Sequence, residues 1–212
     1  MKKIILSSMV LIVAFTGAVQ AAGDAEAGKT KAVACGGCHG ADGNSLVPTF
    51  PKLAGQNERY LIKQINDIKS GARPVPTMAG QVDNMSDEDI ADIAAWYASQ
   101  AGSGGQADPA TLALGASVYR GGVSASGVAA CAACHGASGS GNAPAGFPKL
   151  SGQHPEYIAD QLRRFRTGAE NTLEQNPAGR TNDGDSRMMR DVAYRMTDNE
   201  IDAVANFIAG LH

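Results

Sequence analysis

Apolar residues recur at helical spacing in four stretches of the chain, two in each half. Within each stretch they are mostly three or four positions apart, which places them on one face of an α-helix. The four stripes are Leu61, Ile65 and Ile68; Ile90, Ile93, Ala94 and Tyr97; Ile158, Leu162 and Phe165; and Ile201, Val204, Ala205 and Ile208. No convincing alternation typical of a strand appears, so the pattern predicts an all-α fold of short helices and long loops.

Residues that favour helix ends bracket these stretches. Asn57 can cap the start of the first helix and Gly71 can end it. Pro155 in the first turn and Gly168 at the end frame the corresponding helix of the second half. The last helix of each half opens with a capping box, formed by Ser86 with Asp89 and by Thr197 with Glu200.

The two halves of the chain are copies of one another. The clearest repeats are Cys35-Gly-Gly-Cys38-His39 with Cys131-Ala-Ala-Cys134-His135, and Phe50-Pro-Lys-Leu-Ala-Gly-Gln56 with Phe147-Pro-Lys-Leu-Ser-Gly-Gln153. The offset between copies grows from 96 residues at the first segment to 97 and then 111 before the last helix. The second half therefore contains an insertion in residues 170–187, whose Asn, Asp, Gly and Arg content predicts a surface loop.

The chain divides into three parts. Residues 1–21 have the charged start, apolar run and small-residue cleavage site of a secretory signal peptide. An uncleaved membrane anchor is the alternative, but the apolar run is barely long enough to span a bilayer. Gly and Ser mark a linker over residues 101–109, so we predict one domain over 22–106 and another over 107–212. Export predicts a periplasmic protein, with peripheral membrane association left open.

Charge and composition narrow the class of protein. Without Lys2 and Lys3 the chain has 16 basic and 21 acidic side chains, a formal charge of −5. Such a balance argues against a nucleic-acid partner. Aromatic residues make up 5% of the chain and Gly occurs 26 times. Two small domains of this composition have little apolar surface for a core, so we expect another group to fill it.

The Cys-x-x-Cys-His segments predict that group. This pattern is the attachment signature of c-type haem. Two thiols on one side of a helical turn can reach both vinyl groups of a porphyrin, while the adjoining histidine supplies an iron ligand. We therefore expect two covalently bound haem c groups. The predicted attachment residues are Cys35, Cys38, Cys131 and Cys134, and the predicted iron ligands are His39 and His135.

Paired cysteines also allow other interpretations. A disulfide is the usual expectation in an oxidising compartment, and a redox-active dithiol or half of a zinc site would use the same spacing. A dithiol does not need a histidine directly after the second cysteine. Zinc would leave the repeated His and Met positions unexplained, so two signatures in register favour haem.

The segments after these signatures resemble those of class I cytochromes c. In that family a proline of a Pro-x-Leu-x-Gly segment offers its backbone carbonyl to the ligand histidine. Pro51 with Leu53 and Pro148 with Leu150 match this pattern. The resemblance implies that these four residues belong to the haem sites, although a turn-forming role for the prolines is also compatible.

The sixth iron ligand is expected among the methionines, because a thioether suits haem iron and raises its potential. Met85 and Met196 directly precede the caps of the last helices, where an apolar side chain packs back on the helix. Met78 and Met189 align across the repeat and lie where class I cytochromes keep their ligand methionine. They are the predicted ligands, with Met188 as an alternative to its neighbour.

Taken together, the tandem domains, the FPKLxGQ segments and the MRDVAYRMT segment resemble the dihaem cytochrome c4 family over essentially the whole mature chain. The resemblance implies an electron carrier, not an enzyme. Its partners would be a quinol-oxidising complex or other donor and a terminal oxidase. Two alternatives stay open: a dihaem electron-accepting subunit of a flavoprotein dehydrogenase, and a dihaem peroxidase, against which the paired methionines argue.

Overall fold

The computed structural model describes residues 23–212, and the predicted signal peptide, residues 1–21, lies outside them. The first half comprises α1 (Ala25–Lys31), α2 (Gly36–His39), α3 (Glu58–Lys69), the 3₁₀ turn η1 (Pro76–Met78) and α4 (Asp87–Ser99). The second comprises α5 (Pro109–Gly121), α6 (Ala132–His135), α7 (Pro155–Glu170), α8 (Met188–Tyr194) and α9 (Asp198–Ala209). Residues 23–212 form no strand beyond two isolated bridges, which confirms the predicted all-α fold.

Capping residues set the starts of the helices as predicted. The Asn57 side chain accepts a hydrogen bond from the Tyr60 N–H at 2.7 Å. Helix α3 then closes before Gly71, whose φ of +77° suits glycine after a helix. Both predicted capping boxes are present, formed by Ser86 with Asp89 and by Thr197 with Glu200.

Gly168 does not end its helix, contrary to the prediction. Helix α7 continues to Glu170. A Cβ atom on Gly168 would lie 2.3 Å from the carbonyl oxygen of Arg180, so the glycine allows the inserted loop to pack against the helix. The insertion is therefore more than a surface loop: Arg180 within it is only 6% exposed.

The first and last helices of each domain cross at a glycine. Helix α1 packs on α4, and α5 packs on α9. A Cβ atom would lie 1.9 Å from the Asp92 carbonyl oxygen if placed on Gly28, and 2.1 Å from the Ala203 carbonyl oxygen if placed on Gly115. Only glycine permits backbones to approach so closely. The crossings fix the helices that lead into the Cys-x-x-Cys-His segments.

Each domain has its own apolar core, and the core of the second domain is larger. The first core is built from Ala32, Leu61, Ile93, Ala94 and Tyr97. The second is built from Val118, Tyr119, Val128, Ile158, Ala159, Leu162, Phe165, Ala193, Met196, Ile201, Val204, Ala205, Phe207 and Ile208. The predicted apolar stripes supply most of the first core and half of the second.

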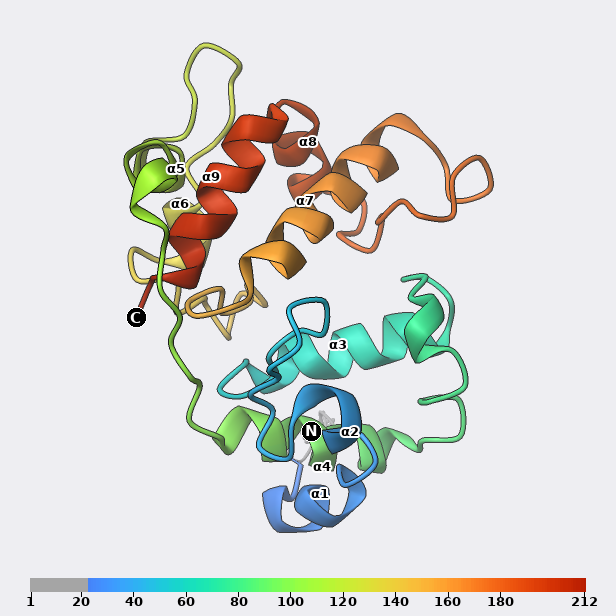
Figure 1. The fold of residues 1–212 in the computed structure, drawn as a ribbon. Coiled ribbons are helices and arrows are strands. Elements are labelled where there is room, and N and C mark those ends of the chain that lie inside the picture. Colours follow the sequence, from blue (N-terminus) through green and yellow to red (C-terminus); the bar gives the residue numbers. More distant parts are fainter. Residues whose placement is uncertain (1–22) are drawn as a thin grey trace, which may run out of the picture.

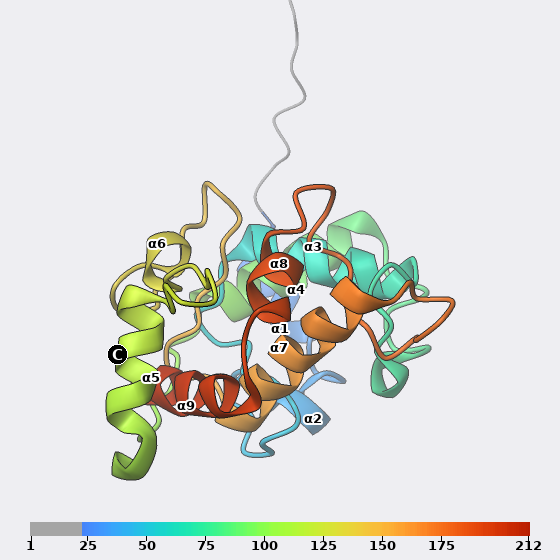
Figure 2. The same cartoon turned by 90° about the horizontal axis from the view of Figure 1, so that it is seen from above.

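Helices α3 and α7 face each other across the boundary between the domains (Figure 1). The view from above shows the second domain lying over the first (Figure 2). Residues 101–108 connect the two without helix or strand. This linker follows the surface of the first domain, where the Ser103 N–H donates to Asn44 Oδ1 at 2.7 Å.

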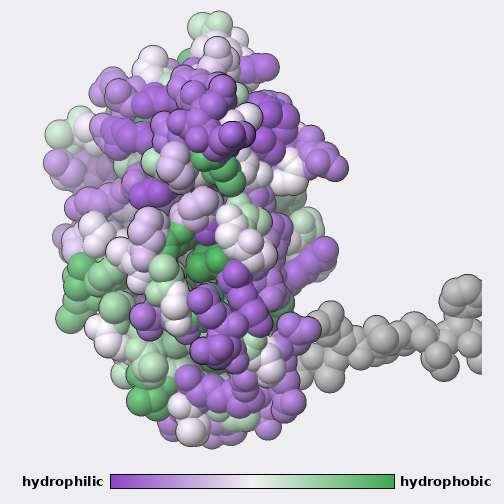
Figure 3. All heavy atoms as spheres, turned by 90° about the vertical axis from the view of Figure 1, so that its right-hand side faces the viewer, coloured by the Kyte–Doolittle hydropathy of each residue, from purple (hydrophilic) through white to green (hydrophobic). Residues whose placement is uncertain are grey.

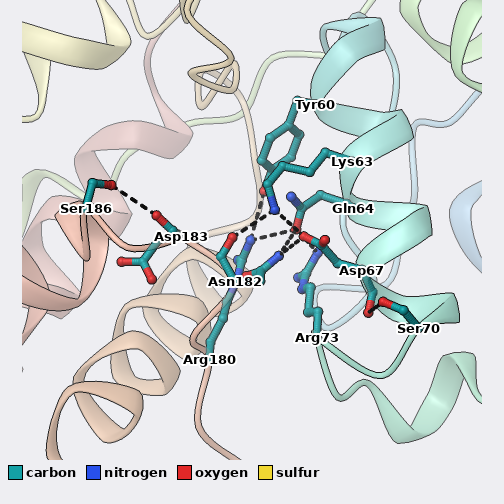
Figure 4. A network of polar contacts seen from close by, with 10 residues as sticks. All are labelled: Tyr60, Lys63, Gln64, Asp67, Ser70, Arg73, Arg180, Asn182, Asp183 and Ser186. Carbon is teal, nitrogen blue, oxygen red and sulfur yellow. Dashed lines mark hydrogen bonds and ion pairs between the residues drawn. The ribbon is translucent and has the colours of Figure 1, made fainter.

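A buried polar network joins α3 to α7. Arg73 and Arg180 are 8% and 6% exposed. Arg73 donates to Gln64 Oε1 at 3.0 Å and to Gln161 Oε1 at 2.8 Å. Arg180 donates to the same two oxygens at 2.8 and 2.7 Å, respectively. Figure 4 shows both arginines converging on Gln64, so each guanidinium bridges the equivalent glutamines of the two domains.

Hydrophilic residues cover most of the face shown in Figure 3, and hydrophobic residues appear there in smaller groups between them. Over residues 23–212, no helix has both the length and the apolar character needed to cross a bilayer.

Candidate haem-binding sites

Each Cys-x-x-Cys-His segment folds into a single short helical turn. In the first domain the His39 N–H donates to the Cys35 carbonyl at 3.0 Å, and in the second the His135 N–H donates to the Cys131 carbonyl at 2.9 Å. Both turns end at a glycine with positive φ, which lets the chain leave sharply after the histidine. The local sequence thereby places two thiols and one imidazole on the same turn.

The two histidines are held in the same way. His39 and His135 are 8% and 7% exposed. Nδ1 of His39 lies 2.9 Å from the Pro51 carbonyl oxygen, and Nδ1 of His135 lies 2.9 Å from that of Pro148. A carbonyl can only accept, so Nδ1 is the donor and Nε2 is the nitrogen available to a metal. Burial lowers the pKa of both histidines, which favours the neutral imidazole that binds iron.

The proline-containing segments are themselves anchored. The Leu53 N–H donates to the Gly43 carbonyl at 2.7 Å, and the Leu150 N–H donates to the Gly139 carbonyl at 2.7 Å. The Leu53 and Leu150 side chains are partly buried against the core of their own domain. Two residues later, the N–H of Gly55 donates to the last turn of α4. The carbonyl that faces each histidine therefore belongs to a braced loop.

The methionines of the first domain occupy different environments. Met78 is the last residue of η1 and is half-buried, outside the core cluster. Met85 packs against that cluster just before the cap of α4. The predicted ligand therefore sits on the loop that follows α3, while its rival contributes to the core.

In the second domain the relevant methionines lie in or near α8, a helix that the sequence patterns did not indicate. Met188 and Met189 form its first turn. Met188 is 47% exposed, whereas Met189 is partly buried against the core. Met196 is 4% exposed and is part of the core itself. The three methionines, which are close together in the sequence, therefore differ clearly in burial.

The alternative interpretations of the cysteines find no support in the geometry. No disulfide joins any two of the four cysteines, all of which lie within the described residues. Burial raises the pKa of Cys131 to about 11 and shifts the pKa of Cys35 in the same direction, whereas a redox-active dithiol needs a lowered thiol pKa. Among residues 23–212, three or more His, Cys, Asp or Glu side chains nowhere gather as a metal site such as zinc requires.

The surroundings of the first site fit a large apolar cofactor. The core of this domain is small for its length, and the half-buried Cys35 lies on its edge. Trp96 Nε1 and Tyr97 Oη are buried without a hydrogen-bond partner, among the described side chains. Two thiols, one neutral imidazole and one thioether are the groups that haem c uses, and the turn of this domain supplies the first three. The residues present therefore fit a covalently attached haem.

Sequence reasoning missed two parts of the surroundings. Gln56 and Gln153, the last residues of the repeated FPKLxGQ segments, are 8% exposed and bond to the opposite domain. The recurrence of this glutamine in both halves could have indicated that it has a role in each domain. Arg180 gave no such signal, because it lies in the insertion that has no counterpart in the first half.

Comparisons with known proteins agree with this geometry. A family model described as cytochrome c matches residues 25–101 and 119–212. Cytochrome c4 of Pseudomonas aeruginosa is 51% identical, over 98% of this chain and 98% of that protein. The crystal structure of reduced recombinant cytochrome c4 from Pseudomonas stutzeri matches with a TM-score of 0.84 at 50% identity, covering 90% of this chain and 100% of that chain.

A more distant relative has a different description. The thiosulfate dehydrogenase electron acceptor of Stutzerimonas stutzeri is 35% identical, over 85% of this chain and 80% of that protein. The family match includes both repeats and the structural match spans both domains, which confirms the two predicted cytochrome c domains. The chain belongs to the dihaem cytochrome c4 family and is an electron carrier, not an enzyme, with two covalently bound haem c groups.

Proposed function

We propose that each haem is attached and ligated by the residues of one repeat. The attachment residues are Cys35 and Cys38 in the first domain and Cys131 and Cys134 in the second, and the proximal ligands are His39 and His135. The observation that supports this assignment best is the repeated proximal geometry. In both domains a buried imidazole donates to a proline carbonyl at 2.9 Å from a turn that also presents two thiols.

Met78 and Met189 are the proposed sixth ligands. Met85 and Met196 pack on or within the cores, so their side chains already have a structural role. Met188 is largely exposed and does not pack against the core, whereas Met189 does. Two His/Met sites would leave no open position for a substrate.

When bound, haem iron exchanges one electron at a time between its ferric and ferrous states. The residues of this chain hold the proposed iron ligands in fixed positions during that exchange. Pro51 and Pro148 fix the tautomer and ring orientation of the two histidines through their carbonyls. Leu53 and Leu150 pack against the cores and anchor the loops that contain these prolines. Fixed ligands need little rearrangement when the charge on iron changes.

The proposed place of the protein is the periplasm, after removal of residues 1–21, either free or at the membrane surface. There it would accept electrons from a quinol-oxidising complex and pass them toward a terminal oxidase. The acidic character of the mature chain and the absence of a helix within residues 23–212 that could cross a bilayer are compatible with a mobile carrier.

A second candidate function is electron acceptor for a dehydrogenase. The relative described as a thiosulfate dehydrogenase electron acceptor covers most of this chain, so the same two-domain scaffold serves that role in another protein. In that case electrons would enter from an enzyme that oxidises a small reduced compound. The flavoprotein alternative named from the sequence belongs to the same class of function.

Electron transfer with purified partners separates the two candidates. We expect a quinol-oxidising complex to reduce both haems of the native protein and a terminal oxidase to reoxidise both, as followed by rapid-mixing absorption spectroscopy. The control omits each partner in turn. Rapid reduction by a thiosulfate dehydrogenase with thiosulfate, together with slow reduction by the quinol-oxidising complex, would contradict the first candidate and support the second.

A further inference from the structure

One peptide group links the proximal histidine of the first domain to a side chain of the second. The carbonyl of the Pro51–Lys52 peptide accepts from His39 Nδ1 at 2.9 Å. The N–H of the same peptide donates to Oε1 of Gln153, in the other domain, at 2.9 Å. A continuous chain of hydrogen bonds therefore runs from the imidazole, through one peptide group, to the amide of Gln153.

The second domain repeats this arrangement in the opposite direction. The Pro148 carbonyl accepts from His135 Nδ1 at 2.9 Å. The Lys149 N–H, on the same peptide group, donates to Oε1 of Gln56 in the first domain at 2.8 Å. The two chains cross the domain boundary once each, so every proximal histidine is connected to a glutamine of the opposite domain.

Both glutamines are held in one orientation. Nε2 of Gln153 donates to the Lys52 carbonyl at 2.9 Å, and Nε2 of Gln56 donates to the Lys149 carbonyl at 2.8 Å. A flipped amide would lose both bonds at once, because a backbone N–H can only donate and a carbonyl can only accept. Each Oε1 also accepts the N–H of the next residue in its own chain at 3.0 Å.

We infer that Gln153 and Gln56 are positioning residues that tune the haem of the opposite domain. Gln153 acts on His39 and Gln56 acts on His135. This inference rests on the proposed ligand role of the histidines. Donation of the peptide N–H to the glutamine polarises the peptide, which strengthens its carbonyl as an acceptor for the histidine. A stronger bond at Nδ1 raises the basicity of the ligand toward iron.

The direction of the effect follows from that basicity. A more basic imidazole stabilises ferric iron over ferrous iron and lowers the reduction potential. Removing the glutamine amide weakens the acceptor and raises the potential of the haem in the other domain. Domain docking and redox tuning are thus performed by the same hydrogen bonds.

Two matched variants test the crosswise pattern. Gln153→Leu is expected to raise the midpoint potential of the first-domain haem more than that of the second, and Gln56→Leu is expected to do the reverse. The potentials are measured haem by haem in the holoprotein, with NMR signals of each haem followed during stepwise reduction. The two variants lose equivalent pairs of bonds across the boundary. Any general effect of weaker docking is therefore the same in both, and each variant is the control for the other.

A further control cuts a different bond across the boundary. His154→Leu removes the contact of His154 Nε2 with the Ser45 carbonyl at 2.8 Å, which does not lie on a proximal peptide. It should not raise one haem potential selectively. Gln153→Glu keeps an acceptor for the Lys52 N–H but loses the donor to the Lys52 carbonyl. Because the acceptor is what polarises the peptide, this variant should lower the potential of the first-domain haem again, and by more than that of the second, which also covers the case in which the leucine variant folds poorly.

The outcomes distinguish this inference from the proposed ligands. Equal shifts of both haems in both leucine variants, or no reversal in Gln153→Glu, would overturn the crosswise tuning if the absorption spectra still report His/Met ligation. Loss of the haem attachment or of low-spin spectra after His39→Ala tests the ligand assignment separately, whatever the glutamine variants do.

Discussion

At the scale of single residues, replacing Met78 or Met189 tests the proposed sixth ligands. Met78→Ala and Met189→Ala should each abolish the contribution of one haem to the weak long-wavelength Met-to-Fe(III) absorption. The reduction potential of the affected haem should fall, because the thioether favours ferrous iron. The absorption spectrum of the oxidised protein and a redox titration measure the two effects.

The neighbouring methionines provide the controls. Met85→Ala and Met196→Ala should keep both absorption contributions. Met196→Ala should still lower the free energy of unfolding, by about 2–5 kcal/mol, because Met196 is buried in the core of the second domain. Persistence of both contributions in Met78→Ala or in Met189→Ala would reject that methionine as a ligand.

The thiols and the proximal histidine of each site could be predicted from the sequence, because they are close together along the chain. Cys35, Cys38 and His39 are adjacent along one turn, so their spacing alone brings them together. The role of Gln153 could not be derived in the same way. Its partner is the Lys52 peptide, about a hundred residues away, and only the packing of two domains brings them within 2.9 Å.

At the scale of helices, the crossing of α5 and α9 depends on Gly115. A methyl group there would lie 2.1 Å from the Ala203 carbonyl oxygen and 2.7 Å from the Phe207 Cβ. Gly115→Ala should therefore lower the free energy of unfolding by about 1–3 kcal/mol or more, since the backbone must move to relieve the clash. Denaturant titration of the holoprotein, followed by circular dichroism, measures this loss.

Gly121 in the same helix is the matched control. A Cβ atom on Gly121 would have no neighbour within 4 Å. Gly121→Ala should be neutral or stabilise the protein by up to about 1 kcal/mol, because alanine restricts the unfolded chain more than glycine does. Equal stability of the two alanine variants would show that the helices do not pack as closely as the structure indicates.

Asp92 joins both ends of α1 to α4 and makes that contact sensitive to acid. Its carboxylate accepts from the Asp24 N–H and from Lys31 Nζ, each at 2.7 Å. The hydrogen bond from Lys31 holds the pKa of Asp92 below its ordinary value of 3.8, despite the nearby Asp89. A carboxyl group with a lowered pKa in the folded protein stabilises it above the ordinary pKa, and this stability is lost as the pH falls through the lowered value.

Asp92→Asn should consequently reduce the melting temperature at neutral pH. The difference from the native protein should shrink as the pH falls from 3.8 through the lowered pKa of Asp92, since the native carboxylate is then progressively protonated and loses its charge. Thermal unfolding at a series of pH values measures both melting temperatures. A difference that stays constant into the acid range would mean that the charge of Asp92 does not contribute.

The sequence predicted helix boundaries correctly where a capping residue marked them. The prediction failed where a distant segment of the chain packs against the helix. The capping boxes at Ser86 and Thr197 start α4 and α9 as their sequence indicates. Gly168 suggested a helix end, but the close approach of the Arg180 backbone explains this glycine instead. Helix α8 was not predicted because it is short and its N-cap residue is Arg187, which has a φ of 50° and makes no capping side-chain bond.

At the scale of the whole molecule, the buried network between α3 and α7 brings charged side chains into the interface between the domains. Asp67 lies at the edge of this network and supplies a carboxylate beside the two arginines. Lys63 and Asn182 both bond to that carboxylate (Figure 4). The repeat predicted two similar domains but not this network, because one of its arginines comes from the insertion that the first domain lacks.

Gln64 is the acceptor at the centre of that network, and its removal should weaken domain docking. Its Oε1 accepts from Arg73 at 3.0 Å, from Arg180 at 2.8 Å and from Asn182 at 3.0 Å. Gln64→Leu leaves buried donors without this partner, a change that costs about 1–3 kcal/mol in stability. Backbone hydrogen exchange should become faster along the facing sides of α3 and α7, as measured by mass spectrometry or NMR on the holoprotein.

The same substitution at an exposed position isolates the effect of the network. Gln106 lies in the exposed linker, so Gln106→Leu should change stability by less than about 0.5 kcal/mol. Faster exchange throughout both domains in Gln64→Leu would indicate general destabilisation. Faster exchange confined to α3, α7 and the loop around Arg180 would show that the two domains separate there first, because the rest of each domain keeps its own core. Unchanged exchange at α3 and α7 would mean that other bonds across the boundary, such as those of the FPKLxGQ glutamines, hold the interface without this network.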